Sequence, residues 1–544
     1  MPVLRFDAER LMELTGLEIN PLMDALFSLK CETSLNEDNE LEVEVNPDRP
    51  DMYISYGISR AVKGIMNFEI GYKGVEASSS NISLRSDSPS TRPYIALATI
   101  YNVKLDEITI KELIQFQEKL HDGIGRKRRK VAIGIHDLDK VPTKDLLYTY
   151  KNLDEEFTPL GYKRMSIRDA LKETGQGVKY GGISVKNNLH PAIVSGGEII
   201  SLPPVINSDI TRLDENTRNL LIDVTGTDAY YVNKVVDIIV SNLYEAKGVG
   251  IGKVKIIKDG KGEETPRLEE KTISVSAKYI NSILGTNLSP VEINYHLLRA
   301  RLNATVNNDA IIVRVPPYRV DIMGGVDIAE EVAISIGYNN MILRKPKEMM
   351  KGGLLEMSKL KRRIKDLMIG LGFTELMSLT LASKHEMEKL GLKGLITISN
   401  PIQEDYNSLR PSLIISMIKA MSKNRGAEKP VRLFEIGRVV SFNGEVKENE
   451  NLAISIMDES LSYEDIQAVV YSLLRVLDID FSISEGGKRY LLKGRGSIIK
   501  IKENEAGFMG EVDPRLLLKF NIDYPMVYAE LSLGEMIGNT GWGA

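Results

Sequence analysis

The alternation of hydrophobic and polar positions is clearest between residues 310 and 338. Residues 310–315 alternate as in a strand that buries one face, and two prolines end that pattern. Gly324 and Gly325 permit a tight turn, and Asp327 then opens a segment with apolar residues at helical spacing: Ile328, Val332 and Ile336. The pattern predicts a strand, a turn and a helix in this order.

Similar patterns elsewhere predict further elements, separated by polar stretches. We expect helices at residues 8–12, 23–29, 109–120, 277–284, 290–298 and 463–477, and strands at 41–45, 96–103 and 131–135. Serine, glycine, proline and charged residues are frequent in three expected linkers, at 73–93, 255–271 and 343–353. The sequence thus predicts a multidomain α+β protein with four modules, at residues 1–90, 91–262, 268–342 and 354–544.

Composition narrows the class of protein. A chain of 544 residues must contain several modules, since single cores rarely grow beyond about 300 residues. The lone Cys31 excludes an internal disulfide framework and favours a reducing compartment. No stretch of about 18 or more apolar residues occurs, so we expect a cytoplasmic protein without a membrane partner. The net charge of -5 means that any nucleic acid must contact a local basic patch or a partner chain.

Four carboxylates gather around the predicted strand end and helix start: Asp321, Asp327, Glu330 and Glu331. Residues three and four positions apart on a helix are neighbours, so the last three would repel one another without a cation among them. Carboxylate oxygens of this kind suit Mg²⁺. Alternatively, Asp327 and Glu330 form a capping box and Glu331 is solvated. The residues alone leave both interpretations open.

Polar side chains within residues 195–228 could line a pocket. Glycines and prolines in this segment bring backbone close together, and Asn207, Ser208 and Thr225 would place neutral groups beside the carboxylate of Asp223. Ordinary turn chemistry explains the same residues equally well.

A run of five basic residues, 126–130, lies at the predicted junction between a helix and a strand. Such a run could bind phosphate, although a solvated loop is the simpler interpretation. His136, Asp137 and Asp139 follow this run. We do not interpret them as a metal site, because no second histidine has the spacing of a metal ligand.

Several catalytic signatures are missing from the sequence. It has neither a GxxxxGK[ST] phosphate loop nor the paired signatures of a class I synthetase, and its five histidines suggest no triad with a nucleophile. The fourth module offers no convincing counterpart of the arginines that hold ATP phosphates in an active class II site. We therefore expect no catalytic residue for adenylation in this chain.

Motifs along essentially the whole chain resemble the beta subunit of phenylalanine–tRNA ligases of the archaeal and eukaryotic type. The acidic segment, with Arg319 before Asp321 and a Gly-Tyr pair at 337–338, resembles the B5 domain of that family. The Asn-Pro-Asp-Arg-Pro-Asp turn at 46–51 is typical of its first domain, and residues 131–139 match as well. The segment 195–228 resembles the B3/B4 editing domain. Further matches to the B6/B7 region lie at residues 398–404, 409–413 and 431–437.

The resemblance implies a B3/B4-type editing domain, a B5 domain of winged-helix type, and a degenerate antiparallel-sheet domain like that of class II synthetases. The chain would join the alpha subunit as alpha2beta2 and support ATP-dependent attachment of phenylalanine to tRNA(Phe), with adenylation on alpha. In the family the four acids bind Mg²⁺ at the alpha contact, and the editing domain hydrolyses tyrosine wrongly attached to this tRNA. Asp223 would recognise the tyrosine hydroxyl, while Thr225, Asn207 and Ser208 position the ester and its attacking water.

Two other functions fit the residues. A stand-alone Mg²⁺-dependent hydrolase would use the four acids around the metal. A structural scaffold would retain the same domains without editing. Copurification with an alpha subunit tests the first alternative, and deacylation of mischarged tRNA tests the second.

Overall fold

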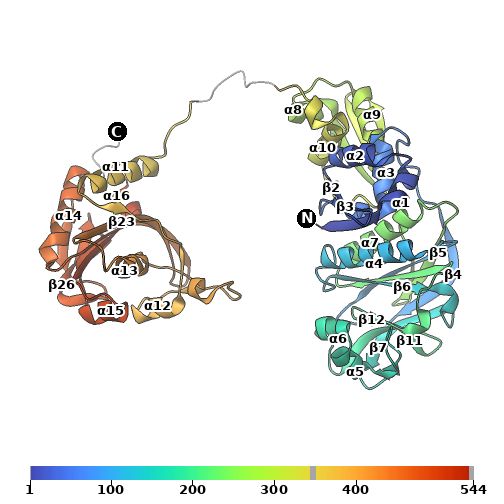
Figure 1. Ribbon diagram of the computed structural model, residues 1–544, viewed down its shortest axis with the longest axis horizontal. Helices are drawn as coiled ribbons and strands as arrows, with labels where there is room; N and C mark the ends of the chain where they lie inside the picture. The colour runs from blue at the N-terminus through green and yellow to red at the C-terminus, as the bar shows by residue number, and fades with distance from the viewer. Residues whose placement is uncertain (1, 344–350, 538–544) are drawn as a thin grey trace. The chain divides into compact units, whose positions relative to one another are not determined.

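The computed structural model describes residues 2–343 and 351–537, and the chain divides into two compact units, Met1–Lys345 and Pro346–Ala544 (Figure 1). The division falls within the linker predicted at 343–353, of which residues 344–350 lie outside the described residues. Among the described residues, no helix has the length and apolar character that crossing a membrane requires.

The N-terminal module packs three helices on a small antiparallel sheet. The sheet has the order β1 (Val3–Asp7), β3 (Glu40–Glu44), β2 (Glu32–Leu35), and the helices are α1 (Ala8–Thr15), α2 (Ile19–Ser28) and α3 (Ser55–Ile65). Leu4 and Phe6 of β1 are buried, because successive side chains of a strand point to opposite faces. Asp7 begins α1, since its side chain accepts a hydrogen bond from the Arg10 amide.

The second module is built on a ten-stranded sheet with the order β12-β11-β10-β7-β4-β14-β5-β13-β6, in which β15 pairs with β14. The strands are β4 (Ala77–Ser86), β5 (Tyr94–Tyr101), β6 (Val131–Asp137), β7 (Asp145–Asn152), β10 (Leu189–Ser195), β11 (Glu198–Leu202), β12 (Ile206–Asn207), β13 (Leu220–Gly226), β14 (Gly250–Lys258) and β15 (Lys261–Thr265). A separate pair consists of β8 (Glu156–Phe157) and β9 (Met165–Ser166), beside α5 (Ile167–Glu173) and α6 (Gly175–Tyr180). Helices α4 (Glu107–Asp122) and α7 (Ala229–Leu243) share a core with Ala96 and Ala98 of β5, whereas Ile95 and Leu97 belong to the core of the opposite face.

The two edge strands of this sheet, β6 and β12, approach each other. The side-chain amide of Asn207 in β12 donates a hydrogen bond to the carbonyl oxygen of Ile135 in β6 at 3.3 Å. The sheet therefore curls until its edges meet, and this seam lies beside α4.

Two of the predicted linkers were wrong. Residues 73–93 contain β4, which pairs in parallel with β14 and β7, and residues 255–271 contain most of the hairpin of β14 and β15. The polar composition hid β4, because its buried side chains are confined to alternate positions near its end: Ile82, Leu84 and Ser86. The predicted boundary at residue 90 is wrong for the same reason, since β4 belongs to the second module.

The third module confirms the strand, turn and helix predicted for residues 310–338. Its sheet has the order β16 (Lys271–Ser276), β18 (Ala310–Val315), β17 (Asn303–Asn307), and its helices are α8 (Ala277–Leu284), α9 (Pro290–Arg299) and α10 (Gly325–Ile336). The Asp327 carboxylate accepts hydrogen bonds from the backbone amides of Met323 and Gly324 at 2.8 Å each. It thereby caps α10 from its third position, with Gly324 as the N-cap, so the predicted capping box of Asp327 with Glu330 is wrong, and Glu331 is buried rather than solvated.

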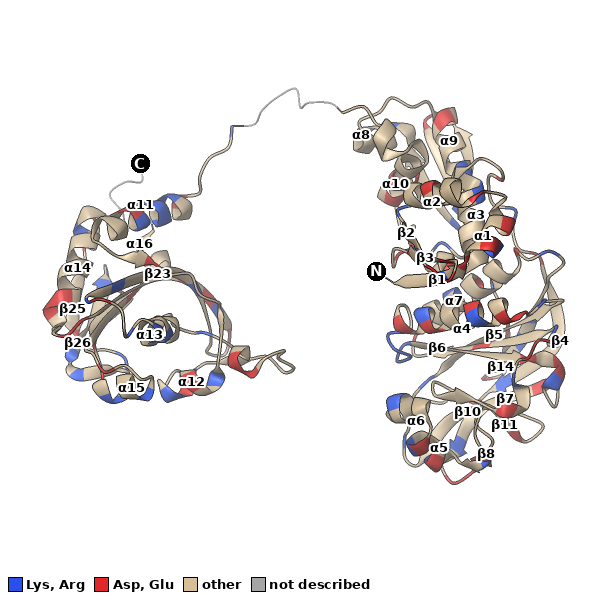
Figure 2. Cartoon of the chain, in the orientation of Figure 1, with Lys and Arg blue, Asp and Glu red and all other residues tan. Residues whose placement is uncertain are grey.

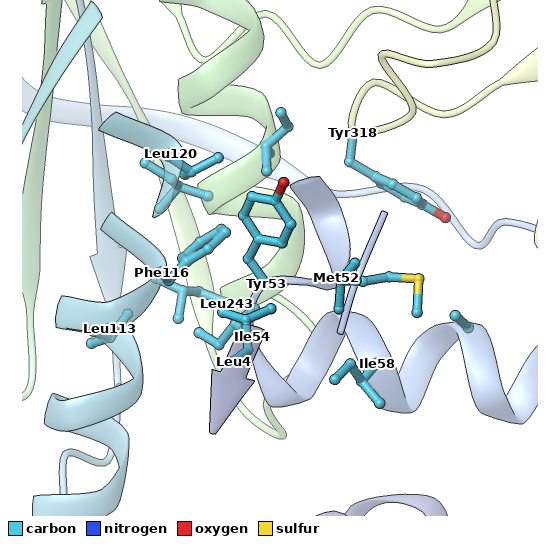
Figure 3. Packing of buried hydrophobic residues seen from close by; sticks show 14 of the residues in the cluster. Leu4, Met52, Tyr53, Ile54, Ile58, Leu113, Phe116, Leu120, Leu243 and Tyr318 are labelled. Atoms are coloured by element: carbon cyan, nitrogen blue, oxygen red, sulfur yellow. The ribbon is translucent and has the colours of Figure 1, made fainter. Parts of the chain in front are cut away.

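One hydrophobic core joins the first three modules. Figure 3 shows Leu4 and Ile54 of the first module packed near Phe116 of α4 and Leu243 of α7. The same core includes Tyr318 of the third module (Figure 3). This shared core explains why the three modules form a single compact unit.

The second unit contains a seven-stranded sheet with the order β19-β23-β24-β28-β27-β26-β25. Its strands are β19 (Thr374–Glu375), β23 (Val431–Phe442), β24 (Val446–Met457), β25 (Ser482–Glu485), β26 (Leu491–Ile501), β27 (Asn504–Val512) and β28 (Met526–Ser532). All neighbours pair antiparallel except β19 with β23, as expected for the last module.

Helices cover both faces of this sheet. One core contains α11 (Glu356–Gly370), α14 (Tyr463–Val476) and α16 (Leu533–Met536), and the other contains α12 (Lys384–Lys389), α13 (Ile414–Lys423) and α15 (Pro514–Lys519). Helix α13 lies inside the curve of the sheet (Figure 1). A small sheet of β20 (Leu381–Ala382), β22 (Ser408–Leu409) and β21 (Ile396–Thr397) completes the unit. The helix predicted at 463–477 is confirmed as α14.

Candidate functional site

A pocket of about 480 Å³ opens at the seam between β6 and β12. Its lining comes from α4, β6, the segment around β11 and β12, and β13. Ile110, Leu113 and Ile114 contribute apolar wall, and the charged or amide side chains in the lining are Gln117, Glu118, Arg128, Gln176, Asn207, Arg212 and Asp223. Apolar walls with a few placed polar groups are typical of pockets that bind small molecules.

Asp223 is the buried carboxylate of this pocket. Its Oδ2 lies 2.8 Å from Nε2 of His136, and Nδ1 of His136 lies 2.7 Å from the hydroxyl of Thr211. All three side chains are buried. Asp223 and His136 lie on the paired strands β13 and β6, so sheet pairing joins residues that are 87 positions apart in the sequence.

The chain of Thr211, His136 and Asp223 has the hydrogen-bond order of a catalytic triad, which the sequence did not suggest. The His136 ring lies between Thr211 and Asp223 and contacts both, and these two side chains are each 1% exposed at the pocket. The arrangement therefore suits His136 to hold Asp223 in place.

Gly134 leaves the space that the Asp223 carboxylate occupies. The two residues are direct partners across β6 and β13. A Cβ atom at position 134 would lie 1.9 Å from Oδ2 of Asp223 and 3.0 Å from Oδ1 of Asn207. Any side chain here would displace the carboxylate, and the ordinary strand pattern around Gly134 gave no sign of this constraint.

Asn207 and Ser208 both line the pocket, which is one of the two interpretations that the sequence left open. Oδ1 of Asn207 accepts a hydrogen bond from the Ser201 hydroxyl at 3.1 Å, while its amide bridges to β6. The Ser208 hydroxyl instead donates to the Thr158 carbonyl oxygen at 2.9 Å and is fully buried. Asn207 is therefore the more available of the two for a ligand.

Thr225 is not among the residues that line the pocket. Its hydroxyl accepts a hydrogen bond from Nε of Arg92 at 3.2 Å, and its carbonyl oxygen accepts from Nη2 of Arg92 at 2.7 Å. Burial lowers the pKa of Arg92 to about 10. Thr225 thus supports a buried arginine in this structure, two residues away from Asp223 on the same strand.

The ion pair of Glu118 and Arg128 was not predicted from the sequence. Nη2 of Arg128 donates to Oε1 of Glu118 at 2.6 Å, and Nη1 donates to the carbonyl oxygens of Pro204 and Val205 at 3.2 and 3.0 Å. Burial would raise the pKa of Glu118, but contacts with His121 and Arg128 outweigh it and lower that pKa to about 2. The basic run at 126–130 was the available signal for Arg128.

The four acids of the third module each have a partner within the chain. The Arg319 guanidinium binds Asp321 at 2.6 Å and Glu331 at 2.5 Å. Glu330 accepts a hydrogen bond from Nζ of Lys30 at 2.8 Å, and Asp327 caps α10. The charges that a cation would balance are therefore largely balanced by side chains and backbone amides.

This geometry does not fit a magnesium site formed by the chain alone. Within residues 2–343 and 351–537, no group of three or more histidine, cysteine, aspartate or glutamate residues is arranged to hold a metal ion. The guanidinium of Arg319 contacts both Asp321 and Glu331, so a cation bound to these two carboxylates would meet a positive charge. The predicted role of these acids as metal ligands stays a prediction, and no chemical step is assigned to them.

The guanidinium of Arg410, in the second unit, forms an ion pair and hydrogen bonds within that unit. Its Nη2 lies 3.0 Å from Oε1 of Glu435, both side chains are buried, and Nη1 donates to the hydroxyls of Ser378 and Ser416. An arginine that binds ATP must offer its guanidinium to phosphate oxygens. The Arg410 guanidinium is instead bound to Glu435, Ser378 and Ser416, and the absence of adenylation residues stays a prediction.

Comparisons with known proteins cover both units. Residues 273–338 match the model of the tRNA synthetase B5 domain, and residues 344–533 match that of the phenylalanyl tRNA synthetase beta chain CLM domain. The chain is 44% identical over 540 residues to the phenylalanine–tRNA ligase beta subunit of Aeropyrum pernix, with 98% of each chain covered. It is 42% identical over 535 residues to that of Saccharolobus solfataricus, with 97% of each chain covered.

A solved structure resembles the first unit. It is an N-terminal fragment of the phenylalanyl-tRNA synthetase beta subunit from Pyrococcus horikoshii, with 30% sequence identity and a TM-score of 0.59. The similarity covers 61% of this chain and 99% of the fragment.

Proposed function

This chain belongs to the phenylalanine–tRNA ligase beta-subunit family, and we propose that its second module hydrolyses tyrosine wrongly attached to tRNA(Phe). We further propose that it assembles with an alpha subunit as alpha2beta2, which attaches phenylalanine to tRNA(Phe) with ATP and Mg²⁺ while alpha carries adenylation. The observation that carries the editing proposal is one buried carboxylate, Asp223, in a largely apolar pocket.

A second site is useful because phenylalanine and tyrosine differ by one hydroxyl. A hydrophobic pocket rejects an analogue that merely adds a hydroxyl by only roughly 10²-fold. The pocket at Asp223 has the opposite preference in our proposal. Oδ2 of Asp223 is bound to His136, and Oδ1 is the oxygen that accepts a hydrogen bond from the tyrosine hydroxyl.

The contact with His136 also sets how strongly phenylalanine is rejected. Asp223 keeps its hydrogen bond to His136 when phenylalanine enters, so rejection does not depend on a carboxylate left without any partner. What phenylalanine lacks is one hydrogen bond to a charged group, which contributes about 1.5–3 kcal/mol, or roughly 10- to 150-fold in rate. We expect a preference of that size for the tyrosyl ester.

The remaining polar groups suit ester hydrolysis. Water attacks the ester carbonyl carbon, the bond from that carbon to the ribose oxygen breaks, and the ribose oxygen takes up a proton. The Asn207 amide supplies an N–H donor of the kind that stabilises the developing oxyanion, and Nε of Arg128 is a second donor, without a hydrogen-bond partner among the described residues. No covalent nucleophile is required, because an aminoacyl ester is activated and a held water can attack it.

Asp223→Ala should leave phenylalanine attachment intact while tyrosyl-tRNA(Phe) accumulates. The variant loses the acceptor for the tyrosine hydroxyl, so the rate of tyrosyl-tRNA(Phe) hydrolysis should fall about 10- to 150-fold. The measurement is deacylation of purified tyrosyl-tRNA(Phe) by the assembled alpha and beta subunits.

Asp237→Asn is the matched control for Asp223→Ala. Asp237 is also a buried aspartate of the second module, but it lies on α7 outside the pocket, and burial raises its pKa to about 6. Equal deacylation by wild type and a folded Asp223→Ala complex would remove Asp223 from the recognition of tyrosine.

His136→Phe should reduce the preference for tyrosyl over phenylalanyl ester, by about tenfold, because Asp223 would lose the donor that orients it. His136→Gln, whose amide can still donate to Asp223, should recover part of the preference. The readout is the ratio of kcat/KM for the two charged tRNAs. An unchanged ratio in folded His136→Phe would show that His136 only fills space.

Neither alternative function gains support from a specific contact. A stand-alone Mg²⁺-dependent hydrolase requires a cluster of metal ligands, whereas Asp321 and Glu331 share Arg319. A scaffold subunit without editing activity would have no need of a buried carboxylate, such as Asp223, in an accessible pocket. The deacylation assay separates that scaffold from the editing subunit proposed here.

A further inference from the structure

The turn between α4 and β6 has an unusual backbone. Arg126, Lys127 and Arg128 are three consecutive residues with positive φ, at 47°, 54° and 64°, and none of them is glycine. The left-handed conformation is sterically unfavourable for each such residue, because its Cβ crowds the following carbonyl oxygen. Strain of this kind persists where surrounding contacts impose it and is concentrated at functional sites.

The surrounding contacts fix this turn on both sides. The amide of Lys130 donates to the carbonyl oxygen of Gly125 at 2.8 Å, and a Cβ atom at Gly125 would lie 2.6 Å from the His121 carbonyl oxygen. Inside the pocket, Arg128 is held by Glu118 and by the carbonyl oxygens of the segment before β12. The turn is therefore anchored to α4, to β6 and to the far wall of the pocket.

The basic residues of this turn lie in two different environments, one buried and one exposed. Arg128 is 7% exposed and points into the pocket wall, whereas Arg126, Lys127 and Arg129 are exposed. The next residue, Lys130, is also engaged, because its Nζ lies 3.3 Å from Oδ2 of Asp228. Three exposed cations thus stand next to an arginine that lines the pocket.

These three cations have no counterion within the parts of the chain that the structure describes. Within residues 2–343 and 351–537, no ion pair or side-chain hydrogen bond involves Arg126, Lys127 or Arg129, and the nearest exposed acid in the sequence is Asp122. In Figure 2 this basic segment lies at the C-terminal end of α4, where the chain passes to β6. Because the whole chain carries a net charge of -5, a polyanion needs such a local patch in order to approach.

We propose that Arg126, Lys127 and Arg129 bind the phosphates of the RNA strand whose terminal nucleotide carries the ester into the pocket. This inference rests on the proposed editing function and names its RNA contact. Arginine matches the geometry of phosphate oxygens, and phosphate contacts position nucleic acid without reading its sequence. The left-handed turn keeps these outward contacts at a fixed distance from the inward Arg128.

The test is the variant Arg126→Gln/Lys127→Gln/Arg129→Gln in the assembled alpha and beta subunits. We expect KM for hydrolysis of tyrosyl-tRNA(Phe) to rise roughly tenfold or more at physiological salt, with kcat unchanged. The slope of log KM against log salt should decrease by roughly 2, since each lost single-strand phosphate contact accounts for about 0.7. Hydrolysis of tyrosyl-adenosine, which has no phosphate, should not change.

The matched control is Lys247→Gln/Lys255→Gln/Lys261→Gln, which removes three exposed charges of the same module outside the pocket lining. It should leave KM and the salt slope unchanged. Equal KM values and salt slopes for the two triple variants would overturn the proposal. A matching loss of tyrosyl-adenosine hydrolysis in the first variant would overturn it too, because the substitutions would then act through Arg128.

Direct binding keeps this inference separate from the editing proposal. Filter binding of an uncharged acceptor-stem minihelix of tRNA(Phe) should weaken roughly tenfold in the first triple variant and stay constant in the control. If wild type hydrolyses neither tyrosyl-tRNA(Phe) nor tyrosyl-adenosine, the editing function fails. The minihelix result still decides whether the basic turn binds RNA.

Discussion

Gly134→Ala should reduce hydrolysis of tyrosyl-tRNA(Phe) about 100-fold, although it adds a single methyl group. The new Cβ would lie 1.9 Å from Oδ2 of Asp223, far closer than two such atoms can approach. Either the carboxylate leaves His136 or β6 moves away from β13. Both changes move the acceptor of the tyrosine hydroxyl by about 1 Å, and a misplacement of that size costs about 10²-fold. Attachment of phenylalanine should continue.

Gly250→Ala provides the matched control. Gly250 lies in β14 of the same sheet, and a Cβ there would meet only Tyr101, at 3.8 Å. The Gly250→Ala variant should hydrolyse tyrosyl-tRNA(Phe) at the wild-type rate. Full activity of a folded Gly134→Ala complex would show that the position of Asp223 does not matter for hydrolysis.

Arg319→Met should lower the free energy of unfolding of the first unit by about 3–5 kcal/mol. Burial would lower the pKa of Arg319, but the neighbouring charges of Asp321 and Glu331 raise it well above its ordinary value. Removing the cation leaves Glu331 buried without its partner, beside a second carboxylate. The measurement is calorimetric unfolding of the full chain, with the transition of the first unit followed.

Two comparisons make this result specific. Arg164→Met removes an exposed ion pair with Glu156, which should cost less than about 1 kcal/mol. Adding Asp321→Asn and Glu331→Gln to Arg319→Met removes the carboxylates left without a partner and should restore much of the lost stability.

Wild-type unfolding should be insensitive to EDTA, whereas a clear destabilisation by EDTA would indicate that metal balances these acids.

The sequence was most informative where local patterns determine structure. The strand at 310–315 and the helix that begins at Gly325 follow from the spacing of apolar residues, although Asp327 caps that helix with Gly324 and not with Glu330 as predicted. Of the four residues proposed for one pocket, Asn207, Ser208 and Asp223 line it and Thr225 does not. Here the resemblance to a family supplied what spacing alone left undecided.

The rest depended on contacts between distant positions. His136 reaches Asp223 only because β6 pairs with β13, and Asn207 meets β6 only because the sheet curls onto itself. Arg128 could not be told from its basic neighbours, since the left-handed turn that sends it inward has no glycine. Local sequence patterns carry no information about such pairings.

The central claim is that the pocket selects the tyrosyl ester, and single-turnover deacylation by the assembled subunits tests it most directly. The rate constants for tyrosyl-tRNA(Phe) and phenylalanyl-tRNA(Phe) would be compared under identical conditions. We expect the tyrosyl ester to be hydrolysed roughly 10- to 150-fold faster, with this preference lost in Asp223→Ala. Equal rates for the two esters in wild type, or no hydrolysis of either, would contradict the account.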